Sequence, residues 1–128
     1  MNTKFIKLIV LLLITSIQLN AQQATEVNST KVVQMLKSDS KLILLDVRTP
    51  DEFSSGHIKG AINIDVRQPD ALNKIEKLDR SAKYIVYCRT NNRSGYVINS
   101  MVKSGFKTVY QMTDGITGWN QNGLPVNK

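Results

Sequence analysis

Short runs of mostly apolar residues recur along the chain, and longer segments with helical spacing of apolar residues separate them. The runs cover residues 41–45, 60–64, 84–87 and 107–110. The run at 41–45 is continuous rather than alternating, which is typical of a strand covered on both faces of a sheet. Strands that alternate with helices predict an α/β fold with a largely parallel sheet.

Five segments between or beside these runs predict helices. They lie after residues 28–30 and before 38–40, between residues 49 and 56, over residues 68–78, over residues 95–103 and around Trp119. The second helix has the clearest start, because Thr49 and Glu52 form a capping box with Pro50 at the first helical position. Residues 22–27 are polar and are expected to form only a loose lead-in.

The first 21 residues have the pattern of an export signal. Lys4 and Lys7 precede an apolar stretch over residues 8–17, and Ala21 offers a small residue for cleavage. The apolar stretch is short for a membrane span, so stable membrane insertion is not expected. We therefore expect residues 1–21 to be removed and the protein to be exported, to the periplasm or out of the cell. An uncleaved N-terminal anchor is the alternative.

The rest of the 128-residue chain is long enough for one compact domain. The chain carries a formal net charge of +7, but its lysines are scattered over predicted helix surfaces, with no basic run and no interleaved aromatic residues. This pattern argues against a nucleic-acid partner and favours a mild attraction for small anions. The sequence contains no metal-ligand cluster and no phosphate-binding loop, so we expect neither a metal nor another cofactor.

The only cysteine, Cys88, lies where the apolar run at 84–87 ends and the helix over 95–103 follows. Ligands bind at this edge of open α/β sheets. A tight loop before a helix offers backbone N–H groups to an anion, and Arg89 and Arg93 add positive charge. A thiol there is expected to exist largely as the nucleophilic thiolate. The alternative, a small buried apolar cysteine, is disfavoured because the apolar run stops before Cys88.

His57 is the only histidine, and it follows the predicted helix that ends at Gly56. A histidine can act as the general base of a nucleophilic cysteine. A lone histidine after a helix end is more often held by backbone hydrogen bonds in a structural corner, and we favour that role for His57.

Several motifs occur in an order and spacing that resemble the rhodanese-like family. They are residues 45–48, 52–53 and 56–63, the loop that begins at Cys88, residues 105–106, and Gly115 with Trp119. The similarity covers about residues 28–126, and the chain resembles the small, single-domain, exported members of the phage-shock protein E type. The resemblance implies one domain with a five-stranded, mostly parallel sheet flanked by helices.

The resemblance also implies the chemistry of a thiosulfate sulfurtransferase, in which a loop cysteine carries sulfane sulfur as a persulfide. Cys88 matches the nucleophile. The loop that binds the donor anion and the outer sulfur matches Arg89, Thr90, Asn91, Asn92 and Arg93, and the supporting positions match Asp46, Arg48 and His57. The implied partners are a small anionic sulfur donor and an acceptor such as cyanide or a thiol, with a redox protein as a further candidate.

Two positions depart from the pattern of many members of the family. Asn91 stands where those members have glycine, and Asp114 precedes Gly115 where they have a pair of glycines. Asparagine tolerates the left-handed backbone region better than most residues, so we expect the tight turn to survive at Asn91.

Three other functions stay open. A phosphatase or arsenate reductase on the same fold needs one more residue between cysteine and arginine, whereas four residues separate Cys88 from Arg93 here. A non-catalytic sulfur carrier or binding module is the second alternative. A purely structural domain is the third, and it is disfavoured because the nucleophile is present.

Overall fold

The computed structural model describes residues 23–128, so the export signal predicted for residues 1–21 lies outside the described residues. Along this part of the chain the elements are β1 (Thr25–Val27), α2 (Ser29–Ser38), β2 (Ile43–Asp46), α3 (Pro50–Ser55), β3 (Ile62–Asn63), α4 (Ala71–Glu76), β4 (Lys83–Tyr87), α5 (Asn92–Lys103), β5 (Thr108–Met112) and α6 (Gly115–Gln121). None of these helices is both long and apolar enough to cross a membrane.

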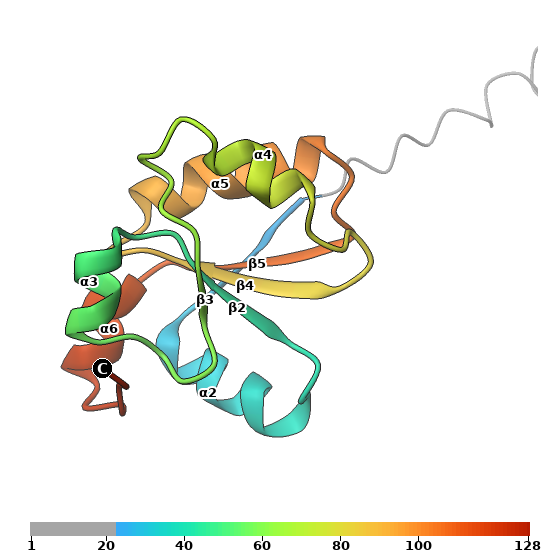
Figure 1. Ribbon diagram of the computed structural model, residues 1–128. Helices are drawn as coiled ribbons and strands as arrows, with labels where there is room; N and C mark the ends of the chain where they lie inside the picture. Colours follow the sequence, from blue (N-terminus) through green and yellow to red (C-terminus); the bar gives the residue numbers. More distant parts are fainter. Residues whose placement is uncertain (1–22) are drawn as a thin grey trace, which may run out of the picture.

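The five strands form one sheet in which every pair is parallel, in the order β1-β5-β4-β2-β3. Figure 1 shows α4 and α5 together on one side of this sheet and α2 on the other side, with α3 and α6 next to each other in the view. The predicted α/β fold, with a five-stranded parallel sheet flanked by helices, is therefore confirmed.

The central strand β4 buries side chains on both of its faces. Tyr84 and Val86 belong to the core that contains residues of α4 and α5, whereas Ile85 and Tyr87 belong to the core that contains residues of α2 and α6. All four side chains are 1% exposed or less. Burial on both faces explains why this strand appears in the sequence as a continuous apolar run.

The prediction of a loose lead-in at residues 22–27 is wrong. Thr25–Val27 forms the edge strand β1, which pairs in parallel with β5. Its first two residues are exposed and only Val27 is partly buried. A short, mostly exposed edge strand leaves no apolar pattern, so this element was invisible to pattern analysis.

Two predicted helices also differ in extent from the observed ones. Helix α5 begins at Asn92 rather than at residue 95, so the last part of the loop after Cys88 is already helical. Helix α4 covers only Ala71–Glu76 of the predicted 68–78 segment. The earlier start of α5 matters most, because it brings the helix N-terminus closer to Cys88.

The parallel sheet determines where Cys88 emerges. The carboxyl ends of parallel strands meet at one edge, and β4 lies between β5 and β2 in that sheet. The backbone N–H of Val47 donates to the carbonyl of Tyr87 at 3.1 Å, which continues the pairing of β2 with β4 up to the residue before Cys88. The segments that follow β2 and β5 therefore flank the loop that begins at Cys88.

Candidate active site

A cavity of about 560 Å³ lies at this edge of the sheet. Three segments line it: the start of α3, the segment after β3, and the loop after β4 together with the first residues of α5. The lining residues are Thr49, Glu52, Arg67, Cys88, Arg89, Thr90, Asn92 and Arg93. Cys88 is 1% exposed, so its sulfur lies at the base of the cavity and the charged side chains lie nearer its mouth.

Within residues 23–128, the sulfur of Cys88 has two hydrogen-bonding partners, both from Ser94. The backbone N–H of Ser94 donates to Sγ at 3.4 Å, and the Ser94 hydroxyl oxygen lies 3.5 Å from Sγ. Among the described residues, the backbone N–H groups of residues 89–93 have no protein acceptor. The loop therefore offers several hydrogen-bond donors to an anion bound beside the sulfur.

Helix α6 holds the loop from behind. The N–H groups of Ile116 and Thr117 donate to the carbonyls of Cys88 and Arg89 at 3.0 and 3.1 Å. In a trans peptide, the carbonyl and the N–H of the next residue point in opposite directions. The two carbonyls that face α6 therefore turn the N–H groups of Arg89 and Thr90 away from that helix.

Gly115 makes this close approach between α6 and the loop feasible. Its φ is 59°, and a β-carbon at this position would overlap the carbonyl oxygens of Arg89 and Thr90. Asn91, in contrast, has a φ of −143°, and no non-glycine residue of the described chain has a positive φ. The chain bends at residues 89–91, but Asn91 does not use the left-handed region that we expected for it.

Arg93 is bound to Glu52 rather than free. Its Nη1 and Nη2 lie 2.7 and 2.9 Å from the two carboxylate oxygens of Glu52. Glu52 also accepts hydrogen bonds from the backbone and hydroxyl of Thr49, which confirms the predicted capping box. The hydrogen bond from Arg93 is the main cause that lowers the pKa of Glu52 to about 2. The sequence indicated the cap but carried no signal of this pairing.

Two other arginines at the cavity lack such a partner. Arg67 and Arg89 are exposed and form no ion pair within the described residues. Arg67 was not among the predicted site residues, because it comes from the segment after β3, far from Cys88 in sequence. One feature of the sequence indicated that Arg67 could belong to the site, namely its position after a predicted strand. The carboxyl ends of parallel strands lie at the edge of the sheet where ligands bind.

Asp46 and Arg48 form a buried pair that does not line the cavity. Arg48 Nη2 lies 2.7 Å from Asp46 Oδ2 and donates to the carbonyl of Gly56, also at 2.7 Å. The Asn63 side chain donates to the carbonyls of both Asp46 and Arg48. The pair thus joins the end of β2 to the end of α3 and to β3, a geometry suited to the supporting role predicted for it.

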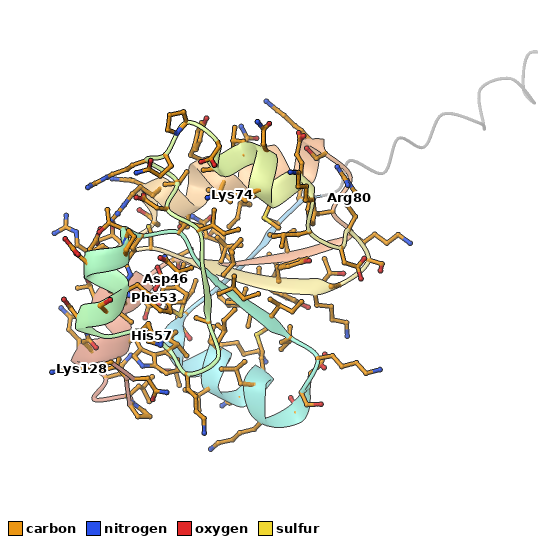
Figure 2. The ribbon with its side chains drawn as sticks, in the orientation of Figure 1. Asp46, Phe53, His57, Lys74, Arg80 and Lys128 are labelled. Carbon is orange, nitrogen blue, oxygen red and sulfur yellow. The ribbon has the colours of Figure 1, made fainter. Side chains whose placement is uncertain are left out.

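His57 also lies outside the residues that line the cavity. Its Nδ1 is 2.8 Å from the carbonyl of Phe53, and the two rings stack with centroids 3.7 Å apart (Figure 2). Its backbone exchanges two hydrogen bonds with Asn127. These contacts are those of a structural corner, and none of them involves Cys88.

The protein is thus an α/β protein with an all-parallel sheet, and a buried thiol and a donor-rich loop lie together at the carboxyl edge of that sheet. A family model for the rhodanese-like domain matches residues 29–122. The chain therefore belongs to the rhodanese-like domain family, as the motifs predicted.

Relatives and solved structures agree with this assignment. The chain is 36% identical over 91 residues to thiosulfate sulfurtransferase 16, chloroplastic, of Arabidopsis thaliana, covering 63% of this chain and 76% of the relative. It is 30% identical to a sulfurtransferase of Allochromatium vinosum, covering 79% of this chain and 92% of the relative. The crystal structure of a rhodanese-related protein from Thermoplasma volcanium superimposes with a TM-score of 0.71 at 29% identity, covering 80% and 97% of the two chains.

The Glu52–Arg93 pair predicts a specific pH dependence of stability. Since Glu52 has a pKa of about 2 in the folded protein against an ordinary value of 4.5, its contribution is complete above about pH 4.5 and is lost as the pH falls toward 2. Glu52→Gln keeps a side chain able to complete the capping box but removes the charge. Its free energy of unfolding in urea should lie below that of the wild type at neutral pH, and the difference should shrink between pH 4.5 and 2.

Asp70→Asn is the control, because the Asp70–Lys74 pair is exposed and contributes little. This variant should show a small difference from the wild type at every pH. A difference for Glu52→Gln that stays constant down to pH 2.5 would show that the ion pair is not its source.

The close approach at Gly115 predicts an unequal effect of two alanine substitutions. Gly115 and Gly123 have similar positive φ values of 59° and 66°, but only a β-carbon at Gly115 would meet another backbone segment. Gly123→Ala should lower the free energy of unfolding by about 1–2 kcal/mol through backbone strain alone. Gly115→Ala should lower it further, because the loop at Cys88 must also move. Equal losses in urea unfolding would contradict the close contact.

Proposed function

We propose that the protein is a sulfurtransferase that moves sulfane sulfur from a small anionic donor, such as thiosulfate, to a thiol or cyanide through a persulfide on Cys88. The observation that carries the proposal is the surroundings of Sγ. It lies at the base of a cavity, accepts the N–H of Ser94, and precedes a run of N–H groups without an acceptor in the described part of the chain. The names of the two relatives above support sulfur transfer as the general reaction.

The proposed reaction has two halves and needs no proton transfer in the first. The Cys88 thiolate attacks the outer sulfur of thiosulfate, a bond forms between Sγ and that sulfur, and the sulfur–sulfur bond of the donor breaks. Sulfite leaves with the electron pair. Cyanide or a thiolate then attacks the outer sulfur of the persulfide, which releases thiocyanate or a new persulfide and returns Cys88 to the thiolate. A reaction of this kind does not require His57 as a base.

The charges around the cavity suit an anionic donor and an anionic leaving group. Arg67 and Arg89 bring guanidinium groups that no carboxylate of the described chain neutralises, and N–H dipoles stabilise charge as it builds on sulfite. Arg93 is different, because Glu52 occupies two of its donors. In our proposal Arg67 and Arg89 meet the donor's charge, and Arg93 acts mainly by joining the loop to α3.

The same pairing argues against the phosphatase alternative. A phosphate group is bound best by a guanidinium that offers two free donors. Two of the Arg93 donors, one on each terminal nitrogen, point at Glu52 instead, and the loop has one residue fewer than phosphate chemistry on this fold requires. Both features favour a donor whose reacting atom is a single sulfur.

Cys88→Ser tests the proposal directly. After incubation with thiosulfate, the intact mass of the wild type should increase by one sulfur atom, and cyanide should remove that increase. Cys88→Ser should gain no mass and should show no turnover with thiosulfate and cyanide, although its loop donors remain. An aryl phosphate is the control substrate.

The outcomes separate the candidate functions. Sulfur loading without turnover would indicate a carrier, and hydrolysis of the aryl phosphate would indicate a phosphatase. If neither protein gains sulfur, or if both do, Cys88 is not the sulfur carrier.

Arg67→Gln tests which cation meets the donor. An exposed charge pair contributes up to about 1 kcal/mol, so the KM for thiosulfate should rise about fivefold while kcat changes little. The increase of KM with salt should also be smaller in this variant, because screening acts on the charge that was removed. Lys59→Gln removes an exposed charge outside the cavity and should leave KM unchanged. Equal effects of the two substitutions would exclude a specific role for Arg67.

A further inference from the structure

Gln111 reaches from the neighbouring strand to the loop that carries Cys88. It lies near the end of β5, paired in register with Val86 of β4. Its Nε2 lies 3.1 Å from the carbonyl oxygen of Asn91 and 3.4 Å from the hydroxyl oxygen of Ser94. A β-carbon at Gly95 would lie 3.4 Å from this nitrogen, so the lack of a side chain at Gly95 leaves room for the Gln111 amide. Nothing in the rhodanese-like motifs marked Gln111.

The hydroxyl of Ser94 is the link between Gln111 and the sulfur. Ser94 is fully buried, and its hydroxyl oxygen lies 3.5 Å from Cys88 Sγ and 3.2 Å from the carbonyl of Asn91. A hydroxyl has one hydrogen to donate, so it can serve either the sulfur or the carbonyl. While Cys88 is a thiol, its S–H can donate to the hydroxyl, and the hydroxyl can donate to Asn91.

The choice changes when the sulfur is negatively charged. A thiolate can only accept, so the Ser94 hydroxyl must turn toward Sγ and the carbonyl of Asn91 loses that donor. The carbonyl of Asn91 still keeps two donors, because the backbone N–H of Gly95 and the Gln111 amide already donate to it. The second hydrogen of the Gln111 amide can meanwhile donate to the Ser94 oxygen, which strengthens the bond from the hydroxyl to the sulfur.

We propose that Gln111 is a positioning residue that turns the Ser94 hydroxyl toward Cys88 and thereby stabilises the thiolate needed for sulfur transfer. The proposal rests on the sulfurtransferase function proposed above, but the contacts that carry it concern the state of the sulfur alone. Gln111 is not among the residues that line the cavity, and its side-chain hydrogen bonds within the described residues go to Asn91 and Ser94, so in this proposal it acts on the sulfur through Ser94.

Charged side chains near Cys88 and Gln111 also influence how readily the sulfur becomes a thiolate, and their influence must be separated from that of Gln111. Arg89 lies on the loop and Arg93 in the first turn of α5, while Glu52 comes from α3 and Arg67 from the segment after β3. On the other side of Gln111, its register partner on β1 is Glu26. Replacing Gln111 by an uncharged residue leaves all of these charges in place.

The experiment measures the rate at which iodoacetamide alkylates Cys88 as a function of pH. Cys88 is the only cysteine, so the reaction reports one site. In Gln111→Leu the midpoint of the profile should move up by about 0.5–1 pH unit, as expected for the loss of one hydrogen bond. Ser94→Ala should move it in the same direction, and the double variant should not exceed the larger single shift, because both changes break one relay.

Two further variants keep the result unambiguous. Gln111→Glu preserves the size of the side chain but removes its donors and adds negative charge, so it should raise the midpoint at least as far as Gln111→Leu. Glu26→Gln removes a nearby negative charge. Because this removal favours an anionic sulfur, the midpoint of the alkylation profile in this variant should stay unchanged or fall. Urea unfolding of each variant separates a change in the sulfur from a loss of fold.

An unchanged midpoint in both Gln111 variants, or additive shifts in the double variant with Ser94→Ala, would overturn the proposal. Failure of the sulfurtransferase function has a different signature. In that case thiosulfate adds no sulfur to the wild type, while the alkylation profiles still report whether Gln111 acts on the thiolate.

Discussion

Two backbone hydrogen bonds from α6 to the loop after β4 determine what the site can do. By holding the carbonyls of Cys88 and Arg89, they leave the following N–H groups directed away from α6. The arrangement requires glycine at position 115. It also requires α6 to stay in place, and Asp114 contributes to that by accepting two hydrogen bonds from the start of α2 at Ser29. The departure from a glycine pair therefore gives the chain an additional link between α2 and α6.

A second constraint is that the arginines at the cavity differ in whether a carboxylate pairs with them. One guanidinium, that of Arg93, is bound on two of its nitrogens by Glu52, and the Glu52 carboxylate at the same time caps α3. The positions of the loop and of α3 are thus coupled through one carboxylate. The positive charge left for a ligand comes from Arg67 and Arg89, which are exposed at the mouth of the cavity. In the proposed function, positioning and anion binding are therefore assigned to different arginines.

The parts of the site that are local in sequence could be predicted, and the parts that come from distant segments could not. Cys88 and the loop to Arg93 are contiguous, and the apolar run before them indicated the strand end. Glu52 was recognised as part of a capping box, and that local explanation left no sign of its contact with Arg93, 41 residues away. Gln111 reaches the loop only because β5 lies beside β4, a neighbour relation that no local pattern contains.

In the fold, too, features with a local sequence pattern could be predicted and features that depend on other segments could not. The buried strands were visible because burial on both faces demands continuous apolar residues, whereas β1 pairs through its backbone and leaves its first two residues exposed. The start of α5 was placed too late for a related reason. Asn92, Arg93 and Ser94 are polar, and their helical conformation is supported by backbone and loop contacts rather than by apolar spacing, including the bond from the N–H of Gly95 to the carbonyl of Asn91 at 3.0 Å.

The two stages of the proposed reaction place negative charge on different atoms, and the site has a separate set of donors for each. In the thiolate the charge is on Sγ, where Ser94 supplies its N–H and, through Gln111, its hydroxyl. In the persulfide the charge moves to the outer sulfur, about 2 Å farther along a sulfur–sulfur bond. The Ser94 donors at the base of the cavity are then less effective, and in our proposal the N–H groups of residues 89–93, which have no acceptor among residues 23–128, hold that charge. In the proposed reaction, a loop with only one of these sets of donors would stabilise one stage at the expense of the other.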